Sequence, residues 1–590
     1  MTFSQISIFG LLGITILLFI WNRWRYDVVA GLALLTAVYM GLVDAEHAFE
    51  GFSHPAVITV ACVLVISKAL QNSGLVELLL QLLEGSRRST TAQIAANCGL
   101  AGLLSAFMNN VGALALMLPV SIRDAAKAGR PASRVLMPLS FASLLGGLVT
   151  LIGTPPNIII ATFREESLGE PFGMFDFAPV GLTVAVVGLL FIIFIGWRLI
   201  PEKPGDADEQ ERFHITRYMT EARVLSGSGL IGSTVGDLEK ICDNEISVIA
   251  IIRRNRNRLA PSTAEIILED DVLILQGHSE TLNSLLENPG LVQIGVEDIN
   301  QEILQSGDVQ LVEAVVMPNS LMEGSLMRGL RLHQRYGVNL LGVSREGNSP
   351  MFRLGRVRVK TGDVLLLQGN KETLAQTINT LGCLTIASKG RVSQKPGKGL
   401  LIPLLFGCGI VAAATGVVPV QIAFATVCVA LILLNAITLR DAYKSIEWPI
   451  IVLLGCLIPV GDALQSTGGT ELISSAILRV ADDIPLWGLV ALLMLISMLL
   501  SDLIHNSPTA VLMAPLTISL AHSLQISPDP LLMAVAVGAA SAYLTPIGHQ
   551  SNTLVMGPGG YHFGDYWRMG LPLDIIILLV AVPMIIWVWA

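Results

Sequence analysis

Two parts of this chain, one near each end, carry the same motifs in the same order within very apolar sequence. The paired segments are residues 68–74 and 462–468, 109–119 and 505–515, and 150–157 and 545–552. The step from Asn110 to Asn157 is 47 residues, and that from Asn506 to Asn552 is 46 residues. A duplicated apolar unit that Gly, Pro and Asn interrupt is typical of secondary transporters built from structural repeats, and the interruptions mark the substrate site.

The composition is that of a chain that lies mostly in a membrane. Hydrophobic residues make up 52% of the 590 residues and charged residues only 14%, whereas soluble globular chains carry about 25% charged residues. Many apolar runs reach the roughly 18 to 20 residues that a helix needs to cross a bilayer. We therefore predict a polytopic α-helical membrane protein and exclude a large soluble fold.

Basic residues beside the apolar runs set the expected orientation, because Lys and Arg accumulate on the cytoplasmic side. They follow the first run, the third run and the segment that contains Asn110, whereas loop 164–176 is acidic. This pattern predicts re-entrant hairpins at about 91–120 and 485–520, and broken helices at about 135–163 and 531–556. The two units then have opposite orientations in the membrane, as an inverted-repeat transporter requires.

A hydrophilic segment, residues 200–398, separates the two membrane units and is expected in the cytoplasm. It contains its own repeat, since the nearly identical segments 271–277 and 363–369 lie 92 residues apart and each follows a β-rich run. The expected domains are membrane repeat 1 with the N-terminal helices at 1–200, two inserted α/β domains at 210–290 and 305–385, and membrane repeat 2 at 398–590.

Asn110 and Asn506 occupy matched positions at the expected hairpin tips. A helix that is broken inside a membrane exposes backbone groups that only protein or water can satisfy. Exposed carbonyl groups bind small cations, and helix N-termini bind anions. An Asn side chain offers both a hydrogen-bond acceptor and a donor. Each tip can therefore contact a cation and an anionic substrate together.

The second interruption in each unit is a break within a helix. Pro155 and Pro156 have no backbone N–H to donate, so they prevent a continuous helix. The carbonyl groups of residues 150–153 then become available to a ligand. Thr545 and Pro546 repeat the break in the second unit.

These motifs resemble the divalent anion–sodium symporter (DASS) family of dicarboxylate and sulfate carriers. The resemblance rests on the tip segments 109–119 and 505–515 and on the break Leu-Ile-Gly-Thr-Pro-Pro-Asn at 151–157. The central segment resembles a pair of TrkA-C (RCK-C) domains. The resemblance implies a homodimer, a scaffold with a moving transport domain, an elevator-type motion, and sodium as the coupling ion.

The motifs and the resemblance together give a set of candidate binding residues. Family members bind sodium and a carboxylate or sulfate at the hairpin tips, and the central Asn of each tip is present here as Asn110 and Asn506. The candidate substrate-binding residues are Asn109, Asn110, Thr154, Pro155, Asn157, His505, Asn506, Ser507, His549, Ser551, Asn552 and Thr553. The candidate sodium-binding residues are Asn110, Thr150, Gly153, Asn506, Thr545 and Gly548. No cofactor other than the coupling ion is expected.

Five ionisable residues lie in apolar sequence, where such groups are functional by default. They are Lys68, Asp462, Asp502, His505 and His549. Lys68 and Asp462 lie near expected helix ends and can reach the membrane interface. Asp502 and His505 are spaced by one helical turn and would form a proton-linked pair, since His titrates near neutral pH. That pair favours an alternative function as a proton-coupled anion carrier or a sodium/proton antiporter.

The sequence as a whole predicts a secondary active transporter in the cell membrane. It contains no catalytic triad, metal cluster or phosphate loop that would indicate an enzyme. The expected activity is sodium-coupled symport of a small divalent anion, sulfate or a dicarboxylate, with an RCK-gated ion channel as a further alternative. The central domain pair is expected to regulate transport through a cytosolic small molecule or nucleotide. Nothing in the sequence indicates a nucleic-acid partner.

Overall fold

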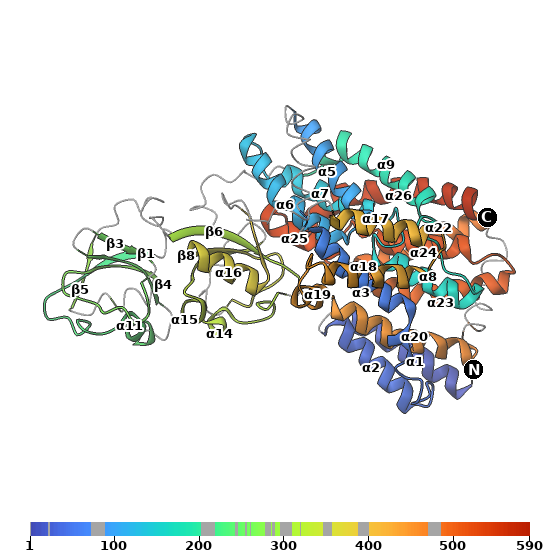
Figure 1. The fold of residues 1–590 in the computed structure, drawn as a ribbon, viewed down its shortest axis with the longest axis horizontal. Coiled ribbons are helices and arrows are strands. Elements are labelled where there is room, and N and C mark those ends of the chain that lie inside the picture. The colour runs from blue at the N-terminus through green and yellow to red at the C-terminus, as the bar shows by residue number, and fades with distance from the viewer. Residues whose placement is uncertain are drawn as a thin grey trace.

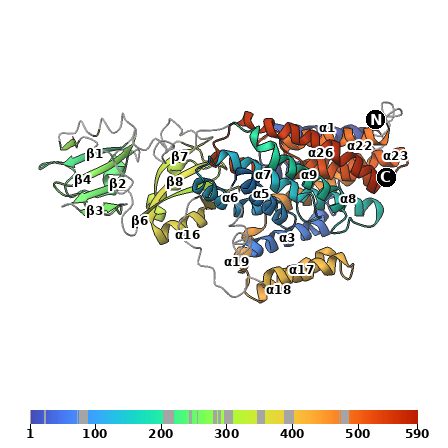
Figure 2. The ribbon, with the colours of Figure 1, turned by 90° about the horizontal axis from the view of Figure 1, so that it is seen from above.

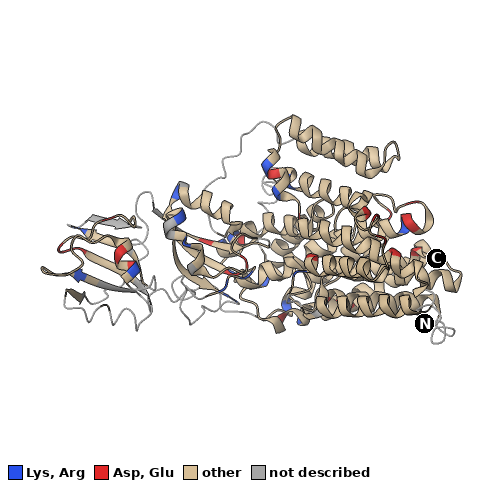
Figure 3. Cartoon of the chain, turned by 90° about the horizontal axis from the view of Figure 1, so that it is seen from below, with Lys and Arg blue, Asp and Glu red and all other residues tan. Residues whose placement is uncertain are grey.

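The computed structural model shows an elongated molecule with a helical body at one end and two small β-sheets at the other (Figure 1). It describes residues 2–590 except 22–23, 72, 74–88, 202–218, 242–245, 254–255, 260, 278–284, 286–289, 295–308, 319, 346–356, 387–400, 470–471 and 473–484. Charged residues gather on the sheets and near the ends of helices, and the helical body is mostly uncharged along its length (Figure 3).

One set of helices precedes the hairpin in each half. It comprises α1 (Phe3–Trp21), α2 (Tyr26–Tyr39) and α3 (Pro55–Gln71), and then α17 (Leu401–Ala414), α18 (Val420–Leu433), α19 (Leu439–Ser445) and α20 (Trp448–Ser466). Helix α2 packs on α20, and α3 packs on α18 and α19. The two halves are therefore interleaved and do not form separate bodies.

A second set of helices forms the core of the helical body. It comprises α5 (Thr90–Ser105), α6 (Asn110–Lys127), α7 (Ser133–Gly147), α8 (Pro155–Leu168) and α9 (Ala178–Phe194), and then α22 (Leu486–Ile504), α23 (Asn506–Leu524), α24 (Asp529–Ala540), α25 (Gln550–Gly559) and α26 (Tyr566–Trp589). Helix α5 packs on α7 as α22 packs on α24, and α9 contacts α5 and α7 as α26 contacts α22 and α24. Helices α9 and α26 also pack on each other, which joins the halves (Figure 2). The helices stop at the predicted interruptions in both halves.

Three helices in the described part of the chain are long and apolar enough to cross a membrane. They span Trp448–Ser466, Leu486–Ile504 and Phe563–Trp589. Several shorter apolar helices accompany them, among them α1, α2, α3, α9, α17, α18 and α24. Short helices are expected where a membrane segment is interrupted, because each half of a broken helix covers only part of the bilayer.

Two antiparallel sheets lie between the halves in sequence. The first contains β1 (Met219–Val224), β2 (Ile246–Arg253), β3 (Arg256–Leu259), β4 (Val272–Gly277) and β5 (Leu291–Ile294) in the order β3-β2-β4-β1-β5, with α11 (Val235–Ile241). The second contains β6 (Val309–Val316), β7 (Asn339–Ser344), β8 (Val364–Asn370) and β9 (Cys383–Thr385) in the order β7-β8-β6-β9, with α14 (Met327–Leu330), α15 (Leu332–Tyr336) and α16 (Lys371–Leu381). The second sheet lies between the first sheet and the helical body (Figures 1 and 2).

The same buried ion pair fixes the turn before the β4 strand of one sheet and the β8 strand of the other. Arg253 contacts both carboxylate oxygens of Asp271 at 2.7 Å, and Arg345 contacts both of Asp363 at 2.7 Å. Both pairs are 18 residues apart in sequence, and the two Arg residues lie 92 residues apart. The hydrogen bonds to Asp271 hold the pKa of Arg253 above its usual range. The 92-residue repeat of the sequence is thus also a repeat of side-chain contacts.

The second sheet contacts the helical body directly. Side chains alternate along β8, so that Leu365 and Leu367 enter the core of the sheet domain. Val364 and Leu366 instead belong to the apolar cluster that includes the membrane helices. At the turn before β8, a Cβ added to Gly362 would come 2.5 Å from the carbonyl oxygen of Thr553 in α25. The backbone of the sheet domain therefore lies against the backbone of α25.

Candidate transport site

Asn110 begins α6 and is fully buried at the tip of the first hairpin. Its surroundings orient the side-chain amide, because only the nitrogen can bond to the acceptors that surround it. The nitrogen donates to Ser105 Oγ at 2.7 Å and to the carbonyl oxygens of Ser143 and Gly153 at 3.1 and 3.3 Å. The tip residue thus connects its own hairpin to α7 and to the break that precedes α8.

Asn506 begins α23 and makes the same set of hydrogen bonds at the second tip. Its amide nitrogen donates to Ser501 Oγ at 2.8 Å and to the carbonyl oxygens of Ala539 and Gly548 at 3.3 and 3.1 Å. Each of these partners stands at the position that corresponds to a partner of the first tip, 395 or 396 residues further along the chain. The match in sequence is therefore also a match in hydrogen bonding.

Asn157 and Asn552 close the breaks in the two halves. The Asn157 amide nitrogen donates to the carbonyl oxygens of Gly147 at 3.3 Å and Thr150 at 2.9 Å. The Asn552 amide nitrogen donates to those of Ala542 at 2.8 Å and Thr545 at 3.2 Å. In both halves the acceptors lie ten and seven residues before the Asn. These bonds satisfy carbonyl groups that the broken helix leaves without backbone partners.

A threonine hydroxyl then ties each break back to the hairpin of the same half. Thr150 Oγ1 donates to the carbonyl oxygen of Ala106, and Thr545 Oγ1 donates to that of Asp502 at 2.8 Å. Thr545 Oγ1 also accepts from the backbone N–H of Gly548 at 3.1 Å. Each half therefore contains one closed polar cluster of hairpin tip and break, here named the first and the second cluster.

Four helices begin at these clusters, so four positive helix ends are available to an anion. Helices α6 and α23 begin at the tips, and α8 and α25 begin after the breaks. The hydroxyl oxygens of Thr154 and Ser551, beside the starts of α8 and α25, are buried without a hydrogen-bond partner among the described residues. Such hydroxyls can donate to an anionic oxygen.

The remaining candidates contribute local contacts. Asn109 Nδ2 donates to Glu447 Oε1 at 2.9 Å, and Pro155 is the first residue of α8. His549 Nδ1 accepts from the backbone N–H of Ser551 at 3.0 Å and caps α25. Thr553 Oγ1 donates to the carbonyl oxygen of Pro546 at 2.6 Å. Ser507 follows the second tip and is buried.

His505 lies in a conformation that the sequence does not suggest. It stands between α22 and α23 with a φ of 76°, in the left-handed region that non-glycine residues rarely adopt. The helix that holds Asp502 therefore ends before His505, and the two residues do not share a helical face. The His505 ring lies edge-on to Tyr26 of α2, with 6.1 Å between ring centres.

Sequence reasoning missed the hydroxyl partners of the tips, Ser105 and Ser501, and the acid beside the first tip, Glu447. Ser105 and Ser501 could have been predicted, because each stands five residues before its Asn in the two halves. Glu447 has no counterpart that an internal comparison could find. Its position next to Asn109 follows only from the packing of α20 in three dimensions.

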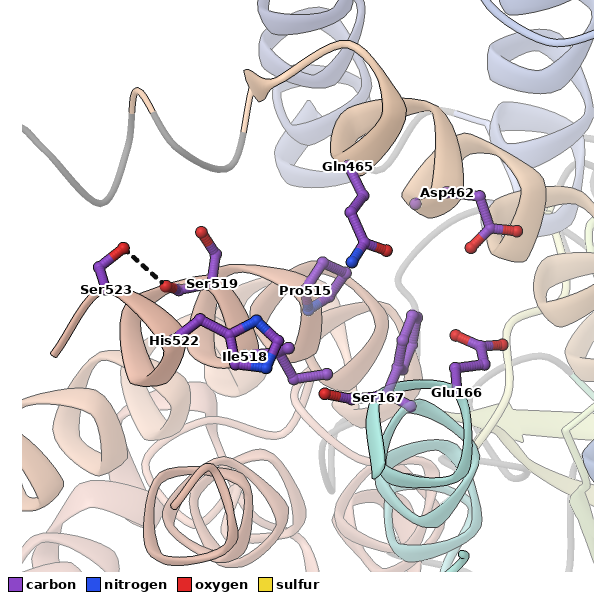
Figure 4. A pocket seen from close by; sticks show the side chains of 11 residues that line it. Glu166, Ser167, Asp462, Gln465, Pro515, Ile518, Ser519, His522 and Ser523 are labelled. Atoms are coloured by element: carbon purple, nitrogen blue, oxygen red, sulfur yellow. Dashed lines mark hydrogen bonds between the residues drawn. The ribbon is translucent and has the colours of Figure 1, made fainter. Parts of the chain in front are cut away.

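A cavity of about 220 Å³ lies away from the clusters, where α8, α20 and α23 meet (Figure 4). Its lining includes Glu166, Asp462 and His522 together with Gln465 and Ser519. None of the candidate substrate or sodium residues lines it. Asp462, which was singled out in apolar sequence, therefore belongs to this cavity and not to a cluster. Lys68 lies elsewhere in α3, where its Nζ donates to Gln71 at 3.4 Å.

Comparison with known proteins identifies the family of this chain. A family model described as a citrate transporter matches residues 16–538 and 486–590, which together cover nearly the entire chain. The chain belongs to the citrate transporter family. It is accordingly a membrane transporter and not an enzyme.

Several known proteins align with this citrate transporter family member at moderate sequence identity. An uncharacterized transporter of Synechocystis is 29% identical over 580 residues, with 97% of this chain and 95% of the relative covered. A putative sulfur deprivation response regulator of Chlamydomonas reinhardtii is 28% identical over 577 residues, with 94% and 97% covered. Sodium/sulfate cotransporter 2 of the same alga is 26% identical over 357 residues, which cover 57% of this chain and 40% of that protein.

These findings confirm the predicted resemblance at the level of a transporter family that includes anion transporters. Two relatives are named as sodium/sulfate cotransporters. The substrate, the coupling ion and the domain division of this chain remain predictions.

Proposed function

We propose that this protein is a sodium-coupled symporter of a small divalent anion, with sulfate as the first substrate to test and a dicarboxylate as the second. The observation that carries the proposal is the pair of matched clusters, each with a tip Asn, a break and two helix N-termini. The names of the sodium/sulfate cotransporters support the same substrate class.

The charge of the clusters supports cation coupling. The hydrogen bonds within the two clusters join Asn, Ser, Thr and backbone groups. No Lys or Arg takes part in these bonds. A dianion bound there must be stabilised by helix N-termini and by co-bound cations, because burying an uncompensated charge is strongly unfavourable. Sodium as a second cargo would supply that charge.

The donors of the clusters suit sodium. Backbone carbonyls at breaks in membrane helices are the usual ligands of transported sodium, and the clusters present such carbonyls together with amide and hydroxyl oxygens. Asn110, Thr150 and Gly153 would hold one ion, and Asn506, Thr545 and Gly548 a second. The hydroxyls of Thr154 and Ser551 would then donate to the anion from the adjoining helix starts.

The proposed mechanism is alternating access by an inverted-repeat, elevator-type transporter that works as a homodimer in the cell membrane. The hairpins and broken helices would form the moving transport domain, and the helices that precede each hairpin would form the scaffold. The closed hydrogen bonding within each cluster supports this division, because tip and break can then move together as one unit.

We further propose that the central segment is a cytoplasmic pair of TrkA-C domains that regulates transport. The contact of Gly362 with Thr553 supports this role, since α25 carries Asn552 and Thr553 of the proposed site. A domain that rests on a moving helix can favour one of its positions, provided that its contacts differ between the two. A cytosolic small molecule or nucleotide that binds the domain pair would change that preference.

Uptake by purified protein in liposomes tests the proposal. Labelled sulfate should accumulate when sodium is high outside and should fail to accumulate when choline replaces sodium. Sulfate uptake that is driven equally well by a proton gradient in choline would replace sodium with protons. Proton efflux on addition of sodium without any anion would instead establish an antiporter, and flux at channel-like rates would establish a gated channel.

A further inference from the structure

The two clusters differ at one position beside the hairpin tips. Thr150 donates to the carbonyl oxygen of Ala106 and Thr545 donates to that of Asp502, so Ala106 and Asp502 occupy equivalent positions. Asp502 also lies against Gly548, because a Cβ added to Gly548 would come 3.1 Å from Asp502 Oδ1. The second cluster therefore adjoins a carboxylate where the first has a methyl group.

A second difference between the two halves lies at the residue just before the break in each half. Leu148 and Tyr543 are equivalent, because the carbonyl oxygen of each packs against a glycine of the long helix that follows. A Cβ on Gly181 in α9 would overlap the carbonyl oxygen of Leu148, and a Cβ on Gly570 in α26 would overlap that of Tyr543. The second half thus carries a phenol where the first carries an aliphatic side chain.

Because Gly181 and Gly570 make equivalent contacts, they align α9 with α26. This alignment shows a third difference between the two halves. Ala185 lies four residues after Gly181, and Asp574 lies four residues after Gly570, about one helical turn in each case. Both are buried, with 4% of Ala185 and 8% of Asp574 exposed. A second buried carboxylate therefore appears in the second half only.

Two of these three polar side chains have a carboxylate oxygen that lacks a hydrogen-bond partner among the described residues. The atoms are Asp502 Oδ2 and Asp574 Oδ1, whereas the Tyr543 hydroxyl lies beside Ser541. All three side chains are more than nine-tenths buried, with 4%, 0% and 8% exposed. Tyr543 interacts electrostatically with both carboxylates, and Asp574 with Asp502. Two unpartnered carboxylate oxygens and one phenol therefore lie in one buried region beside the second cluster.

The charge of this region is not balanced by the surrounding described residues. Asp502 Oδ1 accepts from the backbone N–H groups of Leu544 and Thr545 at 3.1 and 3.2 Å, which offsets part of one charge. No Lys or Arg is among the described groups that act electrostatically on Asp502 or Asp574. Two ionised carboxylates buried in apolar surroundings are strongly unfavourable unless a cation accompanies them or a proton neutralises them.

We propose that Asp502, Tyr543 and Asp574 form a binding site for one sodium ion that exists only in the second half of the protein. Carboxylate and phenol oxygens are hard donors that suit such a cation. The proposal rests on the sodium-coupled function above and adds an ion that the two matched clusters do not account for. Fixed negative charge holds this ion, so it binds without the anion, whereas ions in the neutral clusters gain from the charge of the bound anion.

Thermal unfolding of the purified full chain tests this site directly. The unfolding temperature is measured without sulfate as sodium replaces choline at constant ionic strength. The wild type should be stabilised by sodium, and Asp574→Asn should raise the half-saturating sodium concentration at least 10-fold. Tyr543→Phe should raise it less, and it serves as the milder variant if Asp574→Asn does not fold. Asp462→Asn, which removes a carboxylate of the cavity in Figure 4, should leave the sodium midpoint unchanged.

Several outcomes would overturn the proposal. A wild-type sodium midpoint in both Asp574→Asn and Tyr543→Phe would remove these residues from the site. Equal stabilisation by potassium would show a cation site that does not select sodium, and stabilisation by acid in choline with no sodium effect would show a shared proton. Sulfate binding at saturating sodium separates the two hypotheses. A wild type that binds sodium but never sulfate would refute the proposed function and leave this site intact.

Discussion

Ser140 of α7 donates a hydrogen bond of 2.8 Å to Oδ1 of Asn552 in α25. The bond crosses from the first half of the chain to the second, over 412 residues of sequence, and both side chains are fully buried. Asn552 is the residue whose amide nitrogen closes the second break. The first half therefore orients a site residue of the second half.

Replacement of Ser140 by Ala should weaken this connection without breaking either cluster. We expect a loss of about 1 kcal/mol of stability, the usual contribution of one internal hydrogen bond. Thermal unfolding and sulfate affinity measure the effect, and both should decline. Ser143→Ala is the matched control, because the one partner of the Ser143 hydroxyl among the described residues is the carbonyl oxygen of Ser140 in its own helix. Equal effects of both variants would contradict a special role for the Ser140 contact.

Replacement of Asn110 or Asn506 by Ala should abolish most transport. Each amide makes three buried hydrogen bonds, and loss of such a group costs about 1–3 kcal/mol, or roughly 5- to 150-fold in rate or affinity. Initial sulfate uptake in sodium measures the effect. Thr426→Ala removes an exposed hydroxyl from α18 and should transport normally. Full uptake with unchanged sodium dependence in either Asn variant would refute the site.

Sulfate should stabilise the protein only when sodium is present. A ligand at 100 times its dissociation constant adds about 2.7 kcal/mol to the stability of the folded state. The unfolding temperature should therefore rise with sulfate in sodium and stay constant with sulfate in choline. A sulfate effect of the same size in choline would show that the anion site forms without the cation.

Replacement of Gly362 by Ala should release the sheet domain from α25. The new Cβ would come 2.5 Å from the carbonyl oxygen of Thr553, so the contact must open. If docking restrains α25, sulfate uptake should rise about 5-fold, which corresponds to a coupling of about 1 kcal/mol. Gly227→Ala is the matched control, since Gly227 has a similar positive φ of 95° but no atom close to its Cβ position. Equal uptake by the wild type and Gly362→Ala would argue against regulation through this contact.

Loss of the buried ion pair in the second sheet domain should destabilise that domain. Arg345→Met leaves the carboxylate of Asp363, which is 1% exposed, without its partner at a cost of about 3 kcal/mol. Limited proteolysis should then cut the central segment faster while the helical body stays resistant. Arg358→Met is the control, because Arg345 Nη2 donates to the backbone carbonyl of Arg358, which this substitution keeps. Unchanged proteolysis of Arg345→Met would contradict the structural role of the pair.

The sequence predicts the interruptions well because they depend on local chemistry. Pro155 has no N–H, and Asn110 and Asn506 recur at equal spacing, so the ends of the helices at these points follow from residue type and repetition. The partners of those residues do not follow in the same way. Ser143 and Gly153 become partners of Asn110 only when α7 and the break pack against the hairpin.

His505 illustrates where sequence reasoning fails. A spacing of three residues from Asp502 suggests a shared helical face, but the hairpin tip requires a sharp reversal there. His505 takes that reversal with a positive φ although glycine is the residue that adopts it readily. Contacts between distant segments, such as those of Gly362 with α25 and Asn109 with Glu447, also depend on packing that has no local signature.

The contact between Gly362 and Thr553 also constrains how the chain is made. The two residues are separated by 191 positions, so the sheet domain is synthesised long before the helix on which it rests. Val364 packs on α25, since a Cβ added to Gly557 would come 3.3 Å from Val364 Cγ2. Until α25 is in place this apolar face of the sheet is not covered by it, and an exposed apolar patch is an aggregation site. Biogenesis therefore leaves the central segment exposed to aggregation until the last helices are inserted, and a chain truncated after the sheets would retain that exposure permanently.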